Sequence, residues 1–214
     1  MDEGQFRRGL AGGTGVLAIA GYFWFGVSFA LTTYKWGWLT WALSTTAQVA
    51  ITLSILWAAV RLRRRSRFAP GDVRQADERQ RAATRRIVRA FSWIVLAQTI
   101  LVASAVWWCI RAGAHDMVWP SIGLIVSAHF APLGRIFHVR VYYATAFAGI
   151  VISLSAFTGL TDVHHLAFGF AMAAVMWLSG WYIIRNASRI TARAVSETWA
   201  VRLIHDAARS GGSA

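Results

Sequence analysis

The feature that most constrains this chain is a dense run of arginines between two long apolar blocks. Residues 61–89 contain eleven arginines against three acids, Asp72, Asp77 and Glu78. Placing an arginine at the centre of a bilayer costs at least about 2.5 kcal/mol, even on the mildest scale. We therefore expect this segment to stay on the cytoplasmic side of a membrane, and the apolar blocks beside it to cross.

The rest of the chain divides into apolar blocks of the length that a membrane-spanning helix needs, about 20 residues. Hydrophobic residues make up 57% of the chain and charged residues 14%, whereas soluble domains carry about 25% charged residues. The sequence predicts an all-α polytopic membrane bundle of six transmembrane helices, with both termini cytoplasmic. They form one membrane domain, residues 1–184, with a basic cytoplasmic loop at 61–87. The predicted spans are residues 9–33, 39–60, 88–110, 118–137, 141–160 and 166–184.

Basic residues are distributed very unevenly between the two sides of this predicted topology. Twenty of the 22 Lys and Arg residues fall on the inner side, and only Lys35 and Arg111 fall outside. The positive-inside rule predicts that asymmetry for a multi-pass protein of a cell membrane, here of the bacterial inner-membrane type. Because the charge lies beside apolar spans, it favours contact with anionic inner-leaflet headgroups over nucleic acid. The arginines expected to make that contact are Arg63, Arg64, Arg65, Arg135, Arg140, Arg189 and Arg193.

Residues 185–209 have the pattern of a helix that lies in the inner headgroup layer. Apolar residues recur every four positions, at Val195, Trp199 and Leu203, and arginines recur at the same interval on another face. Such segregation is typical of an amphipathic interfacial helix. The sequence therefore predicts a tail helix separate from the six spans.

Three uncharged polar residues lie near the middle of predicted spans: Gln48, Gln98 and His129. Polar side chains at that depth are expected to face other helices, because lipid offers no hydrogen-bond partner. They form either a network that clasps the helices together, or a site that binds or conducts a solute, or ligands for a cofactor. Because His129 is the only deep histidine, a haem with two axial ligands would need Met172 or Met176 as the second.

Pro132 follows His129 by three residues. It has no N–H to donate to the carbonyl of Ala128, so we expect the fourth span to kink there. The freed carbonyl belongs either to a polar site or to a local packing adjustment. The segment from His129 to Phe137 reads His-Phe-Ala-Pro-Leu-Gly-Arg-Ile-Phe. It resembles a stretch of a family of uncharacterised small multi-pass bacterial membrane proteins, which implies a compact helical membrane fold but supplies no activity.

A second polar group is predicted at the outer face, where His and Asp residues precede the fourth and sixth spans. Imidazole and carboxylate side chains are suitable ligands for zinc and similar metals. Alternatively, Asp116 and Asp162 cap the helices that they precede, where the helix dipole favours negative charge. The single cysteine, Cys109, excludes an internal disulfide and a cysteine-rich metal site. The outer group consists of His115, Asp116, Asp162, His164 and His165.

These observations leave three functional interpretations. The first is a small transporter or channel-like protein with a polar site in mid-membrane. The second is a non-catalytic subunit or adaptor that packs against a membrane protein or a second copy, through the glycine-rich first span with its Gly9 and Gly13 spacing, or through the arginine loop and the tail. The third is an enzyme with a metal at its outer face, which the lack of a recognisable catalytic motif disfavours. We expect no other cofactor.

Overall fold

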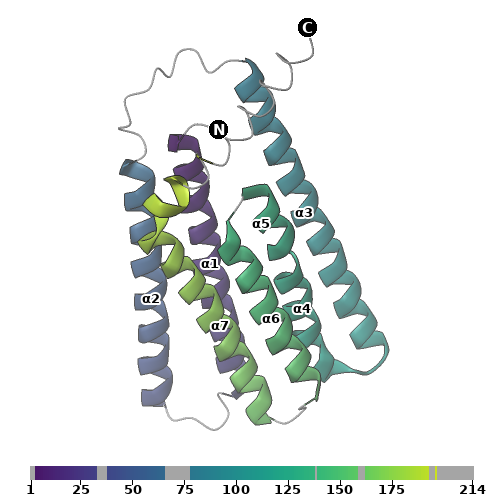
Figure 1. Cartoon of the computed structure of the whole chain (residues 1–214). Coiled ribbons are helices and arrows are strands. Elements are labelled where there is room, and N and C mark those ends of the chain that lie inside the picture. The colour runs from purple at the N-terminus through teal and green to yellow at the C-terminus, as the bar shows by residue number, and fades with distance from the viewer. Residues whose placement is uncertain are drawn as a thin grey trace, which may run out of the picture.

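The computed structural model describes residues 3–32, 38–65, 78–137, 139–158, 162–192 and 196. Within these ranges every regular element is a helix, and six stretches are long and apolar enough to cross a membrane. The prediction of a six-span helical membrane protein is confirmed (Figure 1). The elements are α1 (Glu3–Thr32), α2 (Trp38–Arg65), α3 (Glu78–Arg111), the short 3-10 helix η3 (His115–Met117), α4 (Val118–Ala128), α5 (Phe130–Phe137), α6 (Arg140–Thr158) and α7 (Asp162–Arg185).

The first and last spans, α1 and α7, pack closely against each other along their length. A Cβ added at Gly21 of α1 would lie 2.5 Å from Cδ1 of Trp177, and one added at Gly169 of α7 would lie 2.9 Å from the Cβ of Ser28 and closer still to its hydroxyl. The Trp177 indole N–H donates to the carbonyl of Ala18 at 3.3 Å. Small residues let membrane helices approach to this extent, so glycine on both helices sets the spacing at the centre of the fold.

Two of the glycines at the start of α1, Gly9 and Gly13, lie toward other helices of the bundle. A Cβ on Gly13 would lie 3.4 Å from the ring of Tyr142 in α6, and one on Gly9 would lie 3.9 Å from the ring of Phe137. Tyr142 is itself buried. Gly9 therefore lies toward α5 and Gly13 toward α6 of the same chain.

The helix ends differ from the predicted boundaries on the inner side. Residues 61–65, four of which are arginines, form the end of α2, and α3 begins at Glu78, so much of the predicted loop 61–87 is helical. Arginine is a good helix former, and its long side chain reaches the headgroups from a helix end. The helix ends predicted to be cytoplasmic lie together at one end of the bundle (Figure 1).

The chain beyond α7 continues as a short helix that packs on the bundle. It turns at Asn186, whose side-chain amide donates to the carbonyl of Tyr182 at 3.0 Å, and is helical again over residues 187–192. Ala187 and Thr191 are buried, and Ile190 packs against the core. Residues 187–192 of the predicted tail therefore pack against the bundle, and nearly all of the rest of the tail lies outside the described residues.

Candidate functional site

His129 lies where the fourth span is interrupted. Helix α4 ends at Ala128 and α5 begins at Phe130, with His129 as the turn between them. Its backbone N–H still donates to the carbonyl of Ile125 at 3.2 Å. Pro132 lies in the first turn of α5, where it removes the N–H that the carbonyl of Ala128 would otherwise accept.

The imidazole of His129 is bonded within its own span. Its Nδ1 lies 2.5 Å from the carbonyl oxygen of Val126, which can only accept, so Nδ1 carries the proton. The ring is half-buried and lies against Phe130, with ring centroids 4.3 Å apart. This local bond satisfies one ring nitrogen without any other helix.

Gln48 forms a clasp between α1 and α2. Its side-chain Nε2 donates to the carbonyl oxygen of Tyr22 at 2.6 Å, and the residue is only 4% exposed. The acceptor is a backbone group, so the bond depends on where α1 lies rather than on a second polar side chain. Gln48 therefore joins two helices, as the clasp interpretation expects for one residue.

Gln98 lies on α3, which packs mainly along α4 and α5. It is half-buried, and within the described part of the chain it has no hydrogen-bond partner. Gln48 bonds α1 and His129 bonds its own span, so the structure does not bring Gln48, Gln98 and His129 into one network. Met172 and Met176 are fully buried in the core.

At the outer face, His115 and Asp116 lie in η3 with exposed side chains. The residue that caps α4 is Met117, and no side chain hydrogen-bonds that cap, so the prediction that Asp116 caps the helix is wrong. The side chains of Asp162, His164 and His165 lie outside the described residues. Among the side chains that are described, no three His, Cys, Asp or Glu form a metal-binding group.

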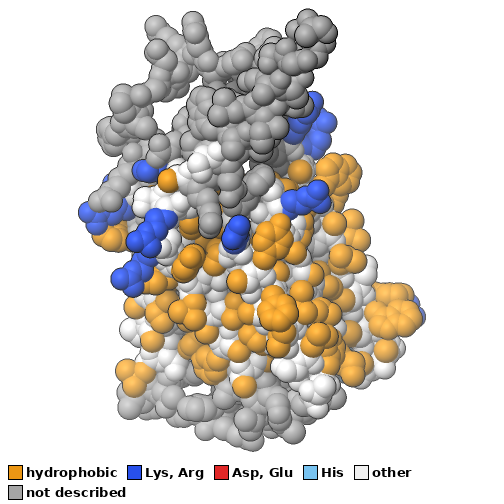
Figure 2. Space-filling view, viewed as in Figure 1, with side chains coloured by type: hydrophobic (Ala, Val, Ile, Leu, Met, Phe, Trp, Pro, Cys, Tyr) orange, Lys and Arg blue, Asp and Glu red, His pale blue; other side chains and the backbone are white. Residues whose placement is uncertain are grey.

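The arginines expected at the inner headgroups lie mostly on the bundle surface. Blue side chains on the face in Figure 2 gather mainly near the inner end of the described bundle, beside a broad hydrophobic surface. Arg61 lies over Trp57, with its guanidinium carbon 5.2 Å from the ring centroid. The side chains of Arg65 and Arg193 lie outside the described residues, whereas the others, Arg63, Arg64, Arg135, Arg140 and Arg189, are exposed.

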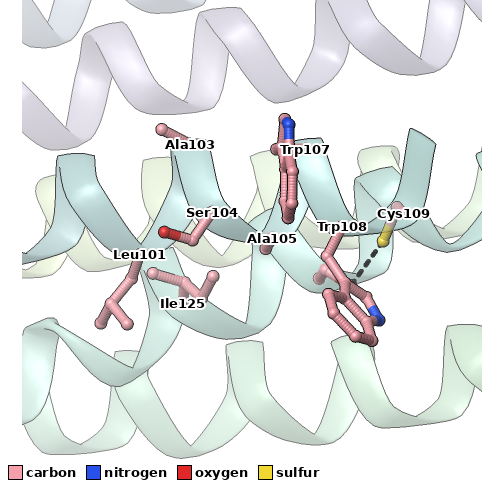
Figure 3. A pocket seen from close by; sticks show the side chains of 9 residues that line it. Leu101, Ala103, Ser104, Ala105, Trp107, Trp108, Cys109 and Ile125 are labelled. Atoms are coloured by element: carbon pink, nitrogen blue, oxygen red, sulfur yellow. Dashed lines mark hydrogen bonds between the residues drawn. The ribbon is translucent and has the colours of Figure 1, made fainter. Parts of the chain in front are cut away.

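A groove between α3 and α4 was missed by the sequence reasoning. It has a volume of about 740 Å³ and is lined mainly by Leu101, Ser104 and Trp108 of α3 with Ser121 and Ile125 of α4 (Figure 3). The Sγ of Cys109 lies 3.9 Å from the Oγ of Ser121 and joins the two helices at its outer end. The small residues that open it, such as Ser104, look in the sequence like ordinary span residues.

Comparison with protein-family models, with curated proteins and with solved structures found no match to this chain. Four features of the structure bear on function: the interrupted fourth span, the α1–α2 clasp, the α3–α4 groove and the high exposure of α3.

Proposed function

We propose that this integral membrane protein is a non-catalytic subunit that holds a partner membrane protein through α3. The observation that carries the proposal is that the membrane-spanning part of α3 is almost entirely unburied. Within residues 89–111 of α3, Cys109 is the only buried residue, whereas residues 167–185 of α7 have eight. Helix α3 lies at the edge of the bundle (Figure 1), and most of its span residues are exposed, which leaves them open to a neighbour in the bilayer.

One face of α3 has the spacing of a helix–helix seam. Arg86, Arg89, Trp93, Leu96 and Ile100, here called the α3 stripe, are separated alternately by three and four residues. All five side chains are exposed. That alternation places residues along one side of a helix and matches the left-handed packing common among membrane helices. The α3 stripe thus continues from an apolar half into a cationic end.

The positive charge of Arg86 and Arg89 indicates which kind of partner fits the α3 stripe. A second copy packed in parallel on the α3 stripe would bring Arg86 and Arg89 against the same arginines, and like charges repel. A partner helix that continues into an acidic cytoplasmic segment would pair with both arginines while its apolar part covers Trp93, Leu96 and Ile100. The proposed partner is therefore a membrane protein with an acidic inner flank.

The test is photo-crosslinking from the apolar part of the stripe. A photoreactive residue at Ile100, which is 56% exposed, should give one adduct whose partner has acidic residues beside its span. Leu53 of α2 is the matched control, because it is 57% exposed and lies at the same depth. Arg86→Glu with Arg89→Glu should abolish the adduct, while Arg63→Glu with Arg64→Glu should not. Equal crosslinking at both positions, or only a homodimer, would refute the proposal.

The interruption at His129 favours a second candidate, movement of a small solute through the bundle. Transporters often place their sites at breaks in spanning helices near the bilayer centre. Here the polar groups near that depth are uncharged amides and an imidazole, which suits a neutral solute. Proteoliposomes should then take up glycerol faster than protein-free liposomes, and His129→Leu should remove the difference while His115→Leu keeps it. Uptake equal to that of protein-free liposomes would rule this candidate out.

A further inference from the structure

The groove between α3 and α4 has the size and lining of a site for an apolar ligand. Its volume of about 740 Å³ lies within the range typical of small-molecule sites, roughly 300–1,000 Å³. Leu101, Trp108 and Ile125 supply apolar surface, and the two serines that line it are small (Figure 3). An occupant must therefore be apolar along most of its length.

The groove extends over the outer half of the membrane-spanning region. It runs along α3 from Leu101, next to the middle of the span at residues 89–111, to Cys109 near its outer end. Eight residues of helix cover about 12 Å at 1.5 Å per residue, and one leaflet of hydrocarbon is about 15 Å deep. A lipid acyl chain of the outer leaflet has matching length and chemistry.

A cation lies at the outer mouth of this groove. The guanidinium carbon of Arg111 is 5.0 Å from the ring centroid of Trp107, and Trp107 lines the groove. Arg111 is exposed and is one of only two basic residues on the predicted outer side. Arginine binds phosphate through two parallel hydrogen bonds, so its position here complements an anionic headgroup.

We propose that the groove binds one anionic phospholipid of the outer leaflet. One acyl chain would lie along Leu101, Ser104 and Trp108, and the phosphate would pair with Arg111. The site is separate from the α3 stripe, which occupies the inner half of the helix. The crosslinking test of the stripe and the lipid test of the groove therefore address different residues, and the two proposals share only the predicted topology.

Native mass spectrometry of the purified full chain with added phosphatidylglycerol tests this site. We expect one lipid to stay bound, and Arg111→Gln to weaken its retention roughly tenfold, as expected for loss of a charge-assisted hydrogen bond. Ser104→Trp should fill the groove and displace the lipid. Ser155→Trp is the control, because Ser155 is an exposed serine in the outer half of α6. Equal retention by the wild type and both groove variants would overturn the proposal.

Two further measurements distinguish a phospholipid from a free phosphate ester as the ligand. Glycerol 3-phosphate in excess should not displace the phosphatidylglycerol, because it lacks the chain that fills the groove. Displacement by that compound would make a free phosphate ester the ligand and overturn the lipid assignment. If an uncharged diacylglycerol is retained as strongly as phosphatidylglycerol, Arg111 does not bind the headgroup and the proposal of an anionic lipid is wrong. If Ser104→Trp does not fold, Arg111→Gln, which alters an exposed side chain, still decides the outcome.

Discussion

Gly149 of α6 and Ser127 of α4 touch where these two helices cross. A Cβ on Gly149 would lie 2.8 Å from the Cβ of Ser127, and a Cβ on Gly123 would lie 2.8 Å from the Oγ of Ser153. The arrangement is reciprocal, because each helix supplies a glycine and, four residues later, a serine. Antiparallel packing brings each glycine against the serine of the other helix, which lets the backbones approach closely.

Gly149→Ala is therefore expected to destabilise the bundle by about 1–3 kcal/mol, the usual cost of overpacking a filled core. Chemical unfolding in detergent micelles measures this change. Gly12→Ala is the control, because a Cβ there meets nothing within 4 Å. The exchanged pair, Ser127→Gly with Gly149→Ser, should recover most of the loss, since it keeps one small and one larger residue at the crossing. Equal effects of both alanines would contradict the argument.

The bond between Gln48 and the carbonyl of Tyr22 leads to a second prediction. Gln48→Leu should lower the free energy of unfolding by about 0.6–2 kcal/mol, because it removes a hydrogen bond between two membrane helices. The same change at Gln98 should be neutral or stabilising, since Gln98 has no bond to lose among the described residues. Thermal unfolding in one detergent compares the two variants. A larger loss of unfolding free energy for Gln98→Leu than for Gln48→Leu would contradict this prediction.

The sequence was sufficient for the number of spans and their type, because hydropathy and helix length act locally. It was not sufficient to predict which helices are in contact. The bond from Trp177 to Ala18 joins residues 159 positions apart, and no local pattern encodes that neighbour. Gln48 donates to a backbone carbonyl, and every residue carries one, so the sequence does not identify this acceptor. Residue types alone therefore suggested a network with Gln98 and His129 that the structure does not contain. The groove depends on the absence of side-chain volume at Ser104, and residue type gives only a weak signal of an unfilled space.

Pro132 gives a third prediction, through the backbone N–H that it lacks. Pro132→Ala restores an N–H that can bond the carbonyl of Ala128, so the variant should be more stable, by up to about 3 kcal/mol. Pro120→Ala is the comparison, because Pro120 is also the third residue of its helix but is fully buried, whereas Pro132 is exposed. Replacement of Pro120 should give no gain and lose packing. Thermal unfolding of both variants measures the difference, and an equal gain in both would refute this explanation.

The orientation of the bundle is the last prediction. In a Cys109→Ala background the chain has no cysteine, so single new cysteines report the side of the membrane on which they lie. A membrane-impermeant maleimide added to intact cells should label His115→Cys, on the outer turn, but not Arg86→Cys, because arginine is retained on the cytoplasmic side. In inside-out vesicles the pattern should reverse. Both side chains are exposed in the structure, so burial does not explain a failure to react. Labelling of Arg86→Cys in intact cells would invert the topology, and with it the cytoplasmic partner inferred for α3 and the outer-leaflet lipid inferred for Arg111.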